Sequence, residues 1–294
     1  MNRRDFLSLA AALPLTPTTT GPEIAFTFDD PHPQPRVNAG ILAALSKHQI
    51  KSVLFVCGMR IDTDAGRELI TEWDRDGHLI ANHSYSHLNL NEETLATFEA
   101  DVLRNEPLVT PYKHFARLFR YPFFKEGDTA QKRDGMRTFL QQHGYRIGRA
   151  TIDASDWAIS ARMEKRVAQT PSADLRGYRD FYLQHIWDRA QYYQGLARQA
   201  WPHPVRHTLL LHHNPLNALY FDSLVAMFVA RGWRPVDAEY AYRDPIYDQQ
   251  PQCLPAGESL VWGLAKQTGR LDSQLRYPGE DDTYENPRMD TLRL

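Results

Sequence analysis

The chain has 294 residues, of which 42% are hydrophobic and 24% are charged, and these values are ordinary for a globular protein with one large core. Its formal net charge of −2 gives no electrostatic reason to expect nucleic acid or an anionic membrane surface as a partner. Two cysteines, Cys57 and Cys253, are too few for a disulfide framework, and neither has a neighbour at the spacing of a cysteine metal site.

The first twenty residues have the pattern of an export signal. Arg3 and Arg4 precede a short, alanine-rich apolar run that ends near Leu15. Paired arginines before such a run resemble a twin-arginine signal, and the run is too short for stable membrane insertion. We therefore expect residues 1–20 to be a signal segment and the protein to be exported to the periplasm or cell envelope. An ordinary tail on a cytoplasmic protein is the alternative.

From residue 21 onward, apolar strand-like runs alternate with segments at helical spacing. We expect helices at 36–48, 64–76, 91–108, 128–143 and 219–230. The expected strands are 24–30, 51–57, 78–81, 115–119, 145–153, 208–211 and 234–236. This alternation is typical of a parallel α/β fold, and we assign it to one domain over residues 21–240.

Two segments depart from the alternation. Residues 172–201 form a long helical stretch rich in tyrosine, which we interpret as an insertion between two strands. Its aromatic side chains either pack the helix onto the domain or line a groove. Residues 241–294 are rich in proline, aspartate and glycine, with one short helix near 258–267. We expect this extension to wrap the domain surface and to carry no chemistry.

Each cluster of polar residues falls at the carboxyl end of an expected strand. In parallel α/β barrels, active sites are built at that end. Five such clusters at five strand ends are much harder to obtain by chance than any one of them. They contain Asp29 and Asp30; His83 and His87; Arg120; Asp153, Asp156 and Trp157; and His212 and His213.

Taken in this order, the five clusters resemble the motifs of the polysaccharide deacetylase family, also called the NodB-homology domain or carbohydrate esterase family 4. The corresponding segments are Thr27-Phe28-Asp29-Asp30, His83-Ser84-Tyr85-Ser86-His87, Arg120-Tyr121-Pro122-Phe123, Asp153-Ala154-Ser155-Asp156-Trp157 and Leu210-Leu211-His212-His213. The resemblance implies a distorted barrel of seven or eight βα units, here with a helical insertion and an irregular carboxyl-terminal extension.

The resemblance also implies a metal site made by Asp30, His83 and His87. Two imidazoles and one carboxylate leave positions open for water and substrate, which a catalytic metal requires. Zn²⁺ is the first expectation, and Co²⁺ or Ni²⁺ would suit the same ligands. Pro31 stands where the family usually has glycine, and we expect it to hold Asp30 in an extended backbone conformation.

Further roles follow from the same resemblance. Asp29 would be the general base that takes a proton from the metal-bound water, with Arg120 orienting its carboxylate. The backbone N–H of Phe123 would stabilise the oxyanion, and Trp157 would form an apolar wall for the substrate.

The resemblance assigns His213 as the general acid. His212 would point the other way if the strand persists, and we expect it to be structural. Either Asp153 or Asp156 would tune the histidine, and the sequence does not decide between them.

The sequence therefore predicts a metal-dependent hydrolase that removes acetyl groups from N-acetylated sugars of a glycan. An O-acetyl esterase or a non-sugar amidase on the same scaffold is one alternative. A catalytically silent glycan-binding protein is another, although such a protein has no need for both a base and an acid. The oligomeric state stays open.

Overall fold

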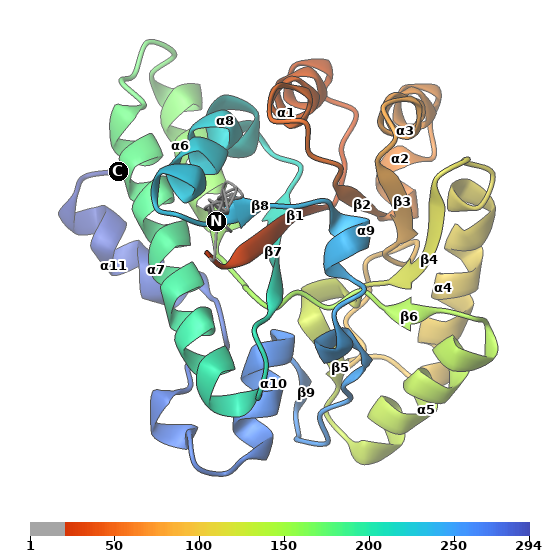
Figure 1. Ribbon diagram of the computed structural model, residues 1–294. Coiled ribbons are helices and arrows are strands. Elements are labelled where there is room, and N and C mark those ends of the chain that lie inside the picture. The colour runs from red at the N-terminus through yellow and green to blue at the C-terminus, as the bar shows by residue number, and fades with distance from the viewer. Residues whose placement is uncertain (1–20) are drawn as a thin grey trace, which may run out of the picture.

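The computed structural model describes residues 21–294, so the expected signal segment lies outside the described residues. A curled, parallel sheet forms its centre, with strand order β6-β4-β3-β2-β1-β7 and with β8 paired to β1 (Figure 1). Every pairing in this sheet is parallel, which confirms the predicted α/β class and its barrel-like form. The strands are β1 (Glu23–Asp29), β2 (Val53–Val56), β3 (Leu79–Asn82), β4 (Phe115–Phe119), β6 (Arg146–Ile147), β7 (Arg206–His212) and β8 (Arg234–Pro235).

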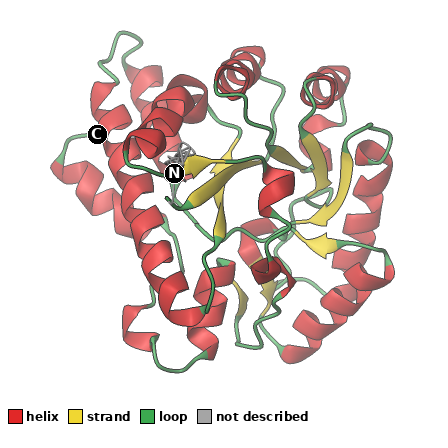
Figure 2. Ribbon diagram, viewed as in Figure 1, coloured by secondary structure: helices red, strands yellow, loops and turns green. Residues whose placement is uncertain are grey.

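Helices surround the sheet on its outer side (Figure 2). They are α1 (Pro35–Lys47), α2 (Gly58–Ile61), α3 (Asp64–Arg75), α4 (Leu95–Val109), α5 (Ala130–Gln142), α6 (Asp156–Gln169), α7 (Arg176–Ala200) and α8 (Pro215–Ala230). Within residues 21–294, none of the helices has the length and apolar character needed to cross a bilayer.

The alternation of side chains along β1 separates the core from the functional side. Phe26 and Phe28 point toward the helices, where the ring of Phe221 lies 5.0 and 5.2 Å from theirs and Trp73 packs against Phe28. Thr27 and Asp29 point to the opposite face because strand side chains alternate. The Asp29 carboxylate therefore lies on the inner face of the curled sheet.

Capping residues set two helix starts that differ from the expected ones. Helix α4 begins after Thr94, whose hydroxyl accepts a hydrogen bond from the N–H of Thr97, rather than after Asn91. Helix α8 begins after Asn214, whose side chain caps the N–H of Asn217, four residues before the expected start. Side-chain capping by Thr94 and by Asn214 therefore sets the two helix starts.

One further expectation about elements is corrected, and one is confirmed. The single strand expected at 145–153 is reduced to Arg146–Ile147, and Ile152 rejoins the sheet only through a bridge to Leu209. A separate helix, α6, precedes the insertion at 172–201, and the insertion itself is one long helix, α7, as expected. Its aromatic residues pack inward, since Tyr178, Tyr182 and Tyr193 are at most 2% exposed.

The carboxyl-terminal segment packs along the domain. It contains α9 (Ala238–Ala241), α10 (Leu260–Gln267), α11 (Asp282–Thr291), two 3-10 turns at Pro245–Asp248 and Asp272–Gln274, and β9 (Ala256–Gly257). Strand β9 pairs with β5 (Lys125–Gly127), which follows a 3-10 turn at Pro122–Phe124. The expected short helix near 258–267 is confirmed as α10. The assigned domain boundaries themselves stay a prediction.

A buried ion-pair network fixes this segment to the sheet. The carboxylate of Glu126 accepts hydrogen bonds from Arg149 at 2.6 and 2.7 Å and from Arg137 at 3.0 Å. The same two guanidinium groups donate to the backbone carbonyls of Gln249 and Pro251. All three charged side chains are buried, so the loss of one charge leaves the others uncompensated.

We expect Glu126→Gln to lower the free energy of unfolding by about 3–5 kcal/mol, the range found when one partner of a buried ion pair is removed. Chemical denaturation followed by circular dichroism measures the change. Glu239→Gln, which removes one partner of the exposed Glu239–Arg243 pair, is the matched control and should leave the stability unchanged within error. Equal losses in the two variants would contradict the assigned role of Glu126.

Candidate active site

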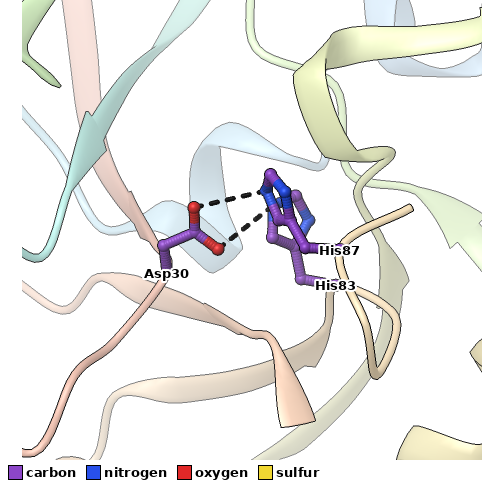
Figure 3. Close-up of side chains that lie close together, drawn as sticks. All are labelled: Asp30, His83 and His87. Carbon is purple, nitrogen blue, oxygen red and sulfur yellow. Dashed lines mark ion pairs between the residues drawn. The ribbon is translucent and has the colours of Figure 1, made fainter. Parts of the chain in front are cut away.

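Three predicted metal ligands converge at one edge of the sheet. Asp30 follows β1, His83 follows β3, and His87 lies in the loop after β3. The Nε2 atom of His87 lies 3.2 Å from Asp30 Oδ2, and that of His83 lies 3.9 Å from Asp30 Oδ1 (Figure 3). One ligand atom from each residue lies within 4.8 Å of the others, so the three could hold a single ion.

The hydrogen bonds of His83 leave it ready to bind a cation. Its Nδ1 lies 2.8 Å from the backbone carbonyl of Arg120, and because a carbonyl only accepts, Nδ1 carries the proton. Burial lowers the pKa of His83 to about 3, so the ring is neutral and Nε2 keeps its lone pair. Asp30 Oδ1 is buried beside it without a hydrogen-bond partner among the described residues. This donor set fits a divalent metal ion.

Asp30 itself is held as a carboxylate. Burial acts to raise its pKa, but the hydrogen bond with His87, the electrostatic effect of the two histidines and the charge of Arg60 together outweigh burial and hold the pKa of Asp30 well below its usual range. Arg60 lies 3.4 Å from Asp30 Oδ2. The expected extended conformation of Asp30 is wrong, because its φ is +58°. This left-handed backbone breaks the strand alternation and turns the Asp30 side chain toward the histidines.

Helix α4 positions the loop that carries both histidines through two of its side chains. The carboxylate of Asp101 accepts hydrogen bonds from the backbone N–H groups of Tyr85 and Ser86. Asn105 donates to the carbonyl of Val56 and to the side chain of Asn82 at the end of β3. These contacts tie the loop between His83 and His87 to rigid elements.

Asp29 lies beside the cluster and is bound to a buried arginine. Arg120 Nη1 donates to Asp29 Oδ1 at 2.6 Å, and the second carboxylate oxygen lies 3.8 Å from His83 Nε2. Burial raises the pKa of Asp29 to about 6 although the charge of Arg120 acts to lower it. A carboxylate with a pKa near neutrality, next to a candidate metal site, can act as a general base.

His212 faces the same side of the sheet as Asp29. The two residues are register partners of the parallel strands β7 and β1, so their side chains project from the same face. His212 Nδ1 lies 2.8 Å from Asp156 Oδ1, and its backbone N–H donates to Asp156 Oδ2. Burial opposes the charged ring, but the charge and hydrogen bond of Asp156 outweigh it and raise the pKa of His212 to about 9.

The expectation that His213 is the acid of the site is corrected by the structure. Its side chain points to the opposite face, where Nε2 lies 3.3 Å from Asn38 Oδ1 and the ring packs against Trp73. Burial lowers the pKa of His213 to about 4. The two histidines point to opposite faces, as the strand alternation predicts. His212, and not His213, lies on the face that carries Asp29.

The two aspartates of the fourth motif, Asp153 and Asp156, have different surroundings. Asp156 is fully buried at the start of α6 and contacts His212, whereas Asp153 accepts a hydrogen bond from the N–H of Ala154. Burial and the nearby charge of Glu258 raise the pKa of Asp153 to about 8. The structure therefore selects Asp156 as the partner of the histidine. Trp157 follows it and is 43% exposed.

Phe123 stands at the rim of the ligand cluster. Its ring lies 4.5 Å from that of His87 in an edge-to-face arrangement, and 59% of the residue is exposed. Its φ of +56° places it in a tight turn after Pro122. An exposed aromatic ring beside the ligands offers an apolar surface to a bound molecule.

Comparisons with known proteins agree with this geometry. The family model described as polysaccharide deacetylase matches residues 16–148, which include Asp29, Asp30, His83, His87 and Arg120. Peptidoglycan-N-acetylglucosamine deacetylase PgdA of Listeria monocytogenes is 25% identical over 159 residues, 53% of this chain and 31% of that protein. Peptidoglycan deacetylase PdaC of Bacillus subtilis superimposes with a TM-score of 0.51 at 19% identity, covering 76% of this chain and 91% of that one. Over residues 16–148, the chain is similar to the polysaccharide deacetylase family.

The similarity to the polysaccharide deacetylase family is partial in two respects. The chain spans about a third of the length of the curated relative, so that protein's whole activity does not transfer directly. A carbohydrate esterase family 4 pseudoenzyme from Bacillus anthracis also superimposes, with a TM-score of 0.55 at 15% identity, covering 76% of this chain and 66% of that one. The fold alone therefore does not establish catalysis, which depends on the side chains of the site.

Two residues that reach this deacetylase-type site were not anticipated from the sequence. The hydroxyl of Tyr242 accepts a hydrogen bond from Arg120 Nη2 at 3.0 Å and donates to the carbonyl of Arg149. Arg60 contacts Asp30 from α2. Tyr242 lies in the carboxyl-terminal extension, which therefore contacts the site through Arg120. No sequence pattern marks either residue, because each reaches the site only through the fold.

A second cluster of possible ligands, His185, Glu280 and Glu285, lies apart from the family motifs. His185 Nε2 accepts a hydrogen bond from the N–H of Ser155, so Nδ1 carries the proton and faces Glu285 Oε2 at 3.3 Å. The two glutamates also pair with Arg189 and Arg276. A protonated Nδ1 cannot bind a metal, so we interpret the cluster as a structural ion-pair network.

We expect Asp156→Asn to lower the pKa of His212 from about 9, because burial disfavours the charged ring and the largest opposing charge is removed. The raised pKa means that the ion pair stabilises the fold fully below the unfolded pKa of about 6.5 and loses this effect as the pH rises through about 9. NMR titration of the imidazole resonances measures the pKa of His212 in the parent protein and in the variant. The resonances of His207, buried and away from Asp156, serve as the control. An unchanged pKa of His212 would contradict the assigned partnership.

Proposed function

We propose that the chain hydrolyses N-acetyl groups of an acetylated glycan with the help of a divalent metal ion. The observation that carries the proposal is the convergence of Asp30, His83 and His87 beside a carboxylate, Asp29, that is held by Arg120 instead of by the histidines. The printed activity of the curated relatives supports N-acetylglucosamine units as the substrate.

The metal site supplies the electrophile in this proposal. A divalent cation held by Asp30, His83 and His87, with Zn²⁺ our first expectation and Co²⁺ or Ni²⁺ as alternatives, would polarise the acetyl carbonyl and acidify a water molecule. Buried, neutral imidazoles and one carboxylate leave room for both water and substrate around such an ion.

Asp29 takes the proton from the attacking water. Its pKa of about 6 keeps it ionised at neutral pH and still basic enough to accept a proton. The short hydrogen bond from Arg120 fixes which carboxylate oxygen is free, and the oxygen that lies 3.8 Å from His83 Nε2 faces the ligand cluster. Asp29 thus reaches the water without replacing a ligand.

His212 donates a proton to the leaving nitrogen. Its pKa of about 9 keeps the ring charged at neutral pH, and the carboxylate of Asp156 holds Nδ1, which leaves the Nε2 proton for transfer. In the same proposal the backbone N–H of Phe123 stabilises the oxyanion, and the exposed ring of Trp157 contacts the acetyl group or the sugar. The base and the acid come from neighbouring strands in register.

The same machinery could act on an O-acetyl ester or a non-sugar amide, and the panel of substrates described below distinguishes these outcomes. A silent glycan-binding protein would not require the paired Asp29–Arg120 and His212–Asp156 contacts. Both pairs are complete here, which favours catalysis.

We expect acetate release from N-acetylated oligosaccharides to be lost on chelation and restored by Zn²⁺ or Co²⁺. Asp29→Asn and His212→Asn should each lower kcat by about 10²–10⁴, the usual contribution of a general base or acid. An enzymatic acetate assay over N-acetylated sugars, O-acetylated sugars and acetylated amines gives the rates and the bond type.

His213→Asn is the matched control, because His213 lies on the other face of the sheet and is assigned no catalytic role. Circular dichroism must show that each variant is folded. A folded His213→Asn with a larger loss than His212→Asn, or an Asp29→Asn with wild-type acetate release, would contradict the proposed roles.

We further propose that residues 1–20 direct export through the twin-arginine route, on the evidence of Arg3 and Arg4 before the apolar run. Arg3→Lys with Arg4→Lys should retain the protein in the cytoplasm, as measured by fractionation and immunoblotting. Normal appearance of the double variant in the envelope fraction would count against this route.

A further inference from the structure

A small ring of contacts surrounds Asp30 at the rim of the site. His32 Nδ1 lies 3.0 Å from the carbonyl of Asp30, so Nδ1 carries a proton and donates it there. His32 Nε2 therefore accepts from Arg60 Nη1, at 3.2 Å, and Arg60 Nη2 lies 3.4 Å from Asp30 Oδ2. The ring closes on Asp30 and leaves His32 no lone pair for a metal.

Arg60 shares its carboxylate partner with the candidate metal site. Within residues 21–294, Asp30 is the only carboxylate at ion-pair distance from Arg60. The other acidic groups nearby have partners of their own: Asp29 is bound by Arg120, Asp62 by Arg67, and Glu164, whose charge acts weakly on His32, accepts a hydrogen bond from Ser160. The carboxylate that pairs with Arg60 is therefore the same carboxylate that would bind the cation.

A divalent cation changes this balance. With a divalent cation held by Asp30, two guanidinium groups and a divalent charge would lie beside the two carboxylates of Asp29 and Asp30. The side chain of Arg60 is 27% exposed, so an incoming molecule can reach it. An excess of positive charge in a partly desolvated pocket attracts an anionic ligand.

We infer that Arg60 binds a carboxylate of the substrate, so that the site prefers acetylated sugars that carry an acidic substituent. A guanidinium group suits this role because its fork of N–H donors matches the two oxygens of a carboxylate. The inference rests on the proposed function, and it names the class of glycan that the same site takes. The carboxylate would lie on the sugar that presents the acetyl group or on its neighbour.

The test compares one ligand in two charge states. The ligand is a tetrasaccharide of alternating N-acetylglucosamine and N-acetylmuramic acid, as the free lactyl carboxylate and as its neutral methyl ester. Calorimetry measures binding to the zinc-loaded full chain in an Asp29→Asn background, so that the ligand is not consumed. We expect the acid to bind about tenfold more tightly than the ester, as one charge-assisted hydrogen-bond pair would give.

Three variants separate recognition from a structural role. Arg60→Gln should bind acid and ester equally, at the level of the ester, whereas Arg60→Lys should retain most of the preference. Arg67→Gln, which removes a nearby exposed guanidinium on α3, should retain all of it. The Kd for Zn²⁺ should be unchanged or lower in Arg60→Gln, because a positive charge beside the ion is removed.

Equal binding of acid and ester by the parent protein, or no binding of either, would overturn the inference. A parallel loss of both ligands in Arg60→Gln, with weaker Zn²⁺ binding, would also overturn it and would make Arg60 a residue that only positions Asp30. The proposed function is judged separately by acetate release. A charge preference without acetate release would contradict the hydrolase alone, and acetate release without a charge preference would contradict this inference alone.

Discussion

The buried ion pair between Arg120 and Asp29 is the constraint on which the site depends. The guanidinium group donates to Asp29, to the hydroxyl of Thr27, to the carbonyl of Gly148 and to the hydroxyl of Tyr242. It also lies 3.9 Å from the centroid of the Phe55 ring. The backbone carbonyl of the same arginine accepts from His83 and so fixes the tautomer of a metal ligand. One residue thus holds the candidate base with its side chain and prepares a ligand with its backbone.

The second constraint is backbone strain concentrated in the same place. Non-glycine residues with positive φ include Asp30, Ser84, His87, Phe123 and Phe124, all within or next to the three motifs that surround the ligand cluster. Such conformations cost of order 1–3 kcal/mol each and persist only where the surrounding structure holds them. Here the hydrogen bonds of Asp101, Asn105 and Arg120 supply that support. The strained turns let adjacent residues make different contacts in one pocket, since Asp29 pairs with Arg120 while Asp30 faces the histidines.

Much of this arrangement could be predicted from the sequence. Apolar runs ending in carboxylates, histidines or an arginine predict parallel strands whose carboxyl ends meet, and the ligand set of Asp30, His83 and His87 comes together as the resemblance implied. What could not be predicted depends on register and on distant segments. The choice between His212 and His213 follows from the pairing of His212 with Asp29, which is a property of the sheet and not of either strand. Tyr242 reaches Arg120 across 122 positions of sequence, and no local pattern marks such a contact.

The central claim is that Asp30, His83 and His87 share one divalent ion while Asp29 stays off it, bound to Arg120. Anomalous diffraction at the zinc edge from a zinc-loaded crystal of the protein tests this most directly. The account predicts one zinc ion with an oxygen of Asp30 and a nitrogen of each histidine at about 2.0–2.2 Å, and with the Asp29 carboxylate outside the coordination sphere. Zinc bound elsewhere in the folded protein, or Asp29 as one of its ligands, would contradict it.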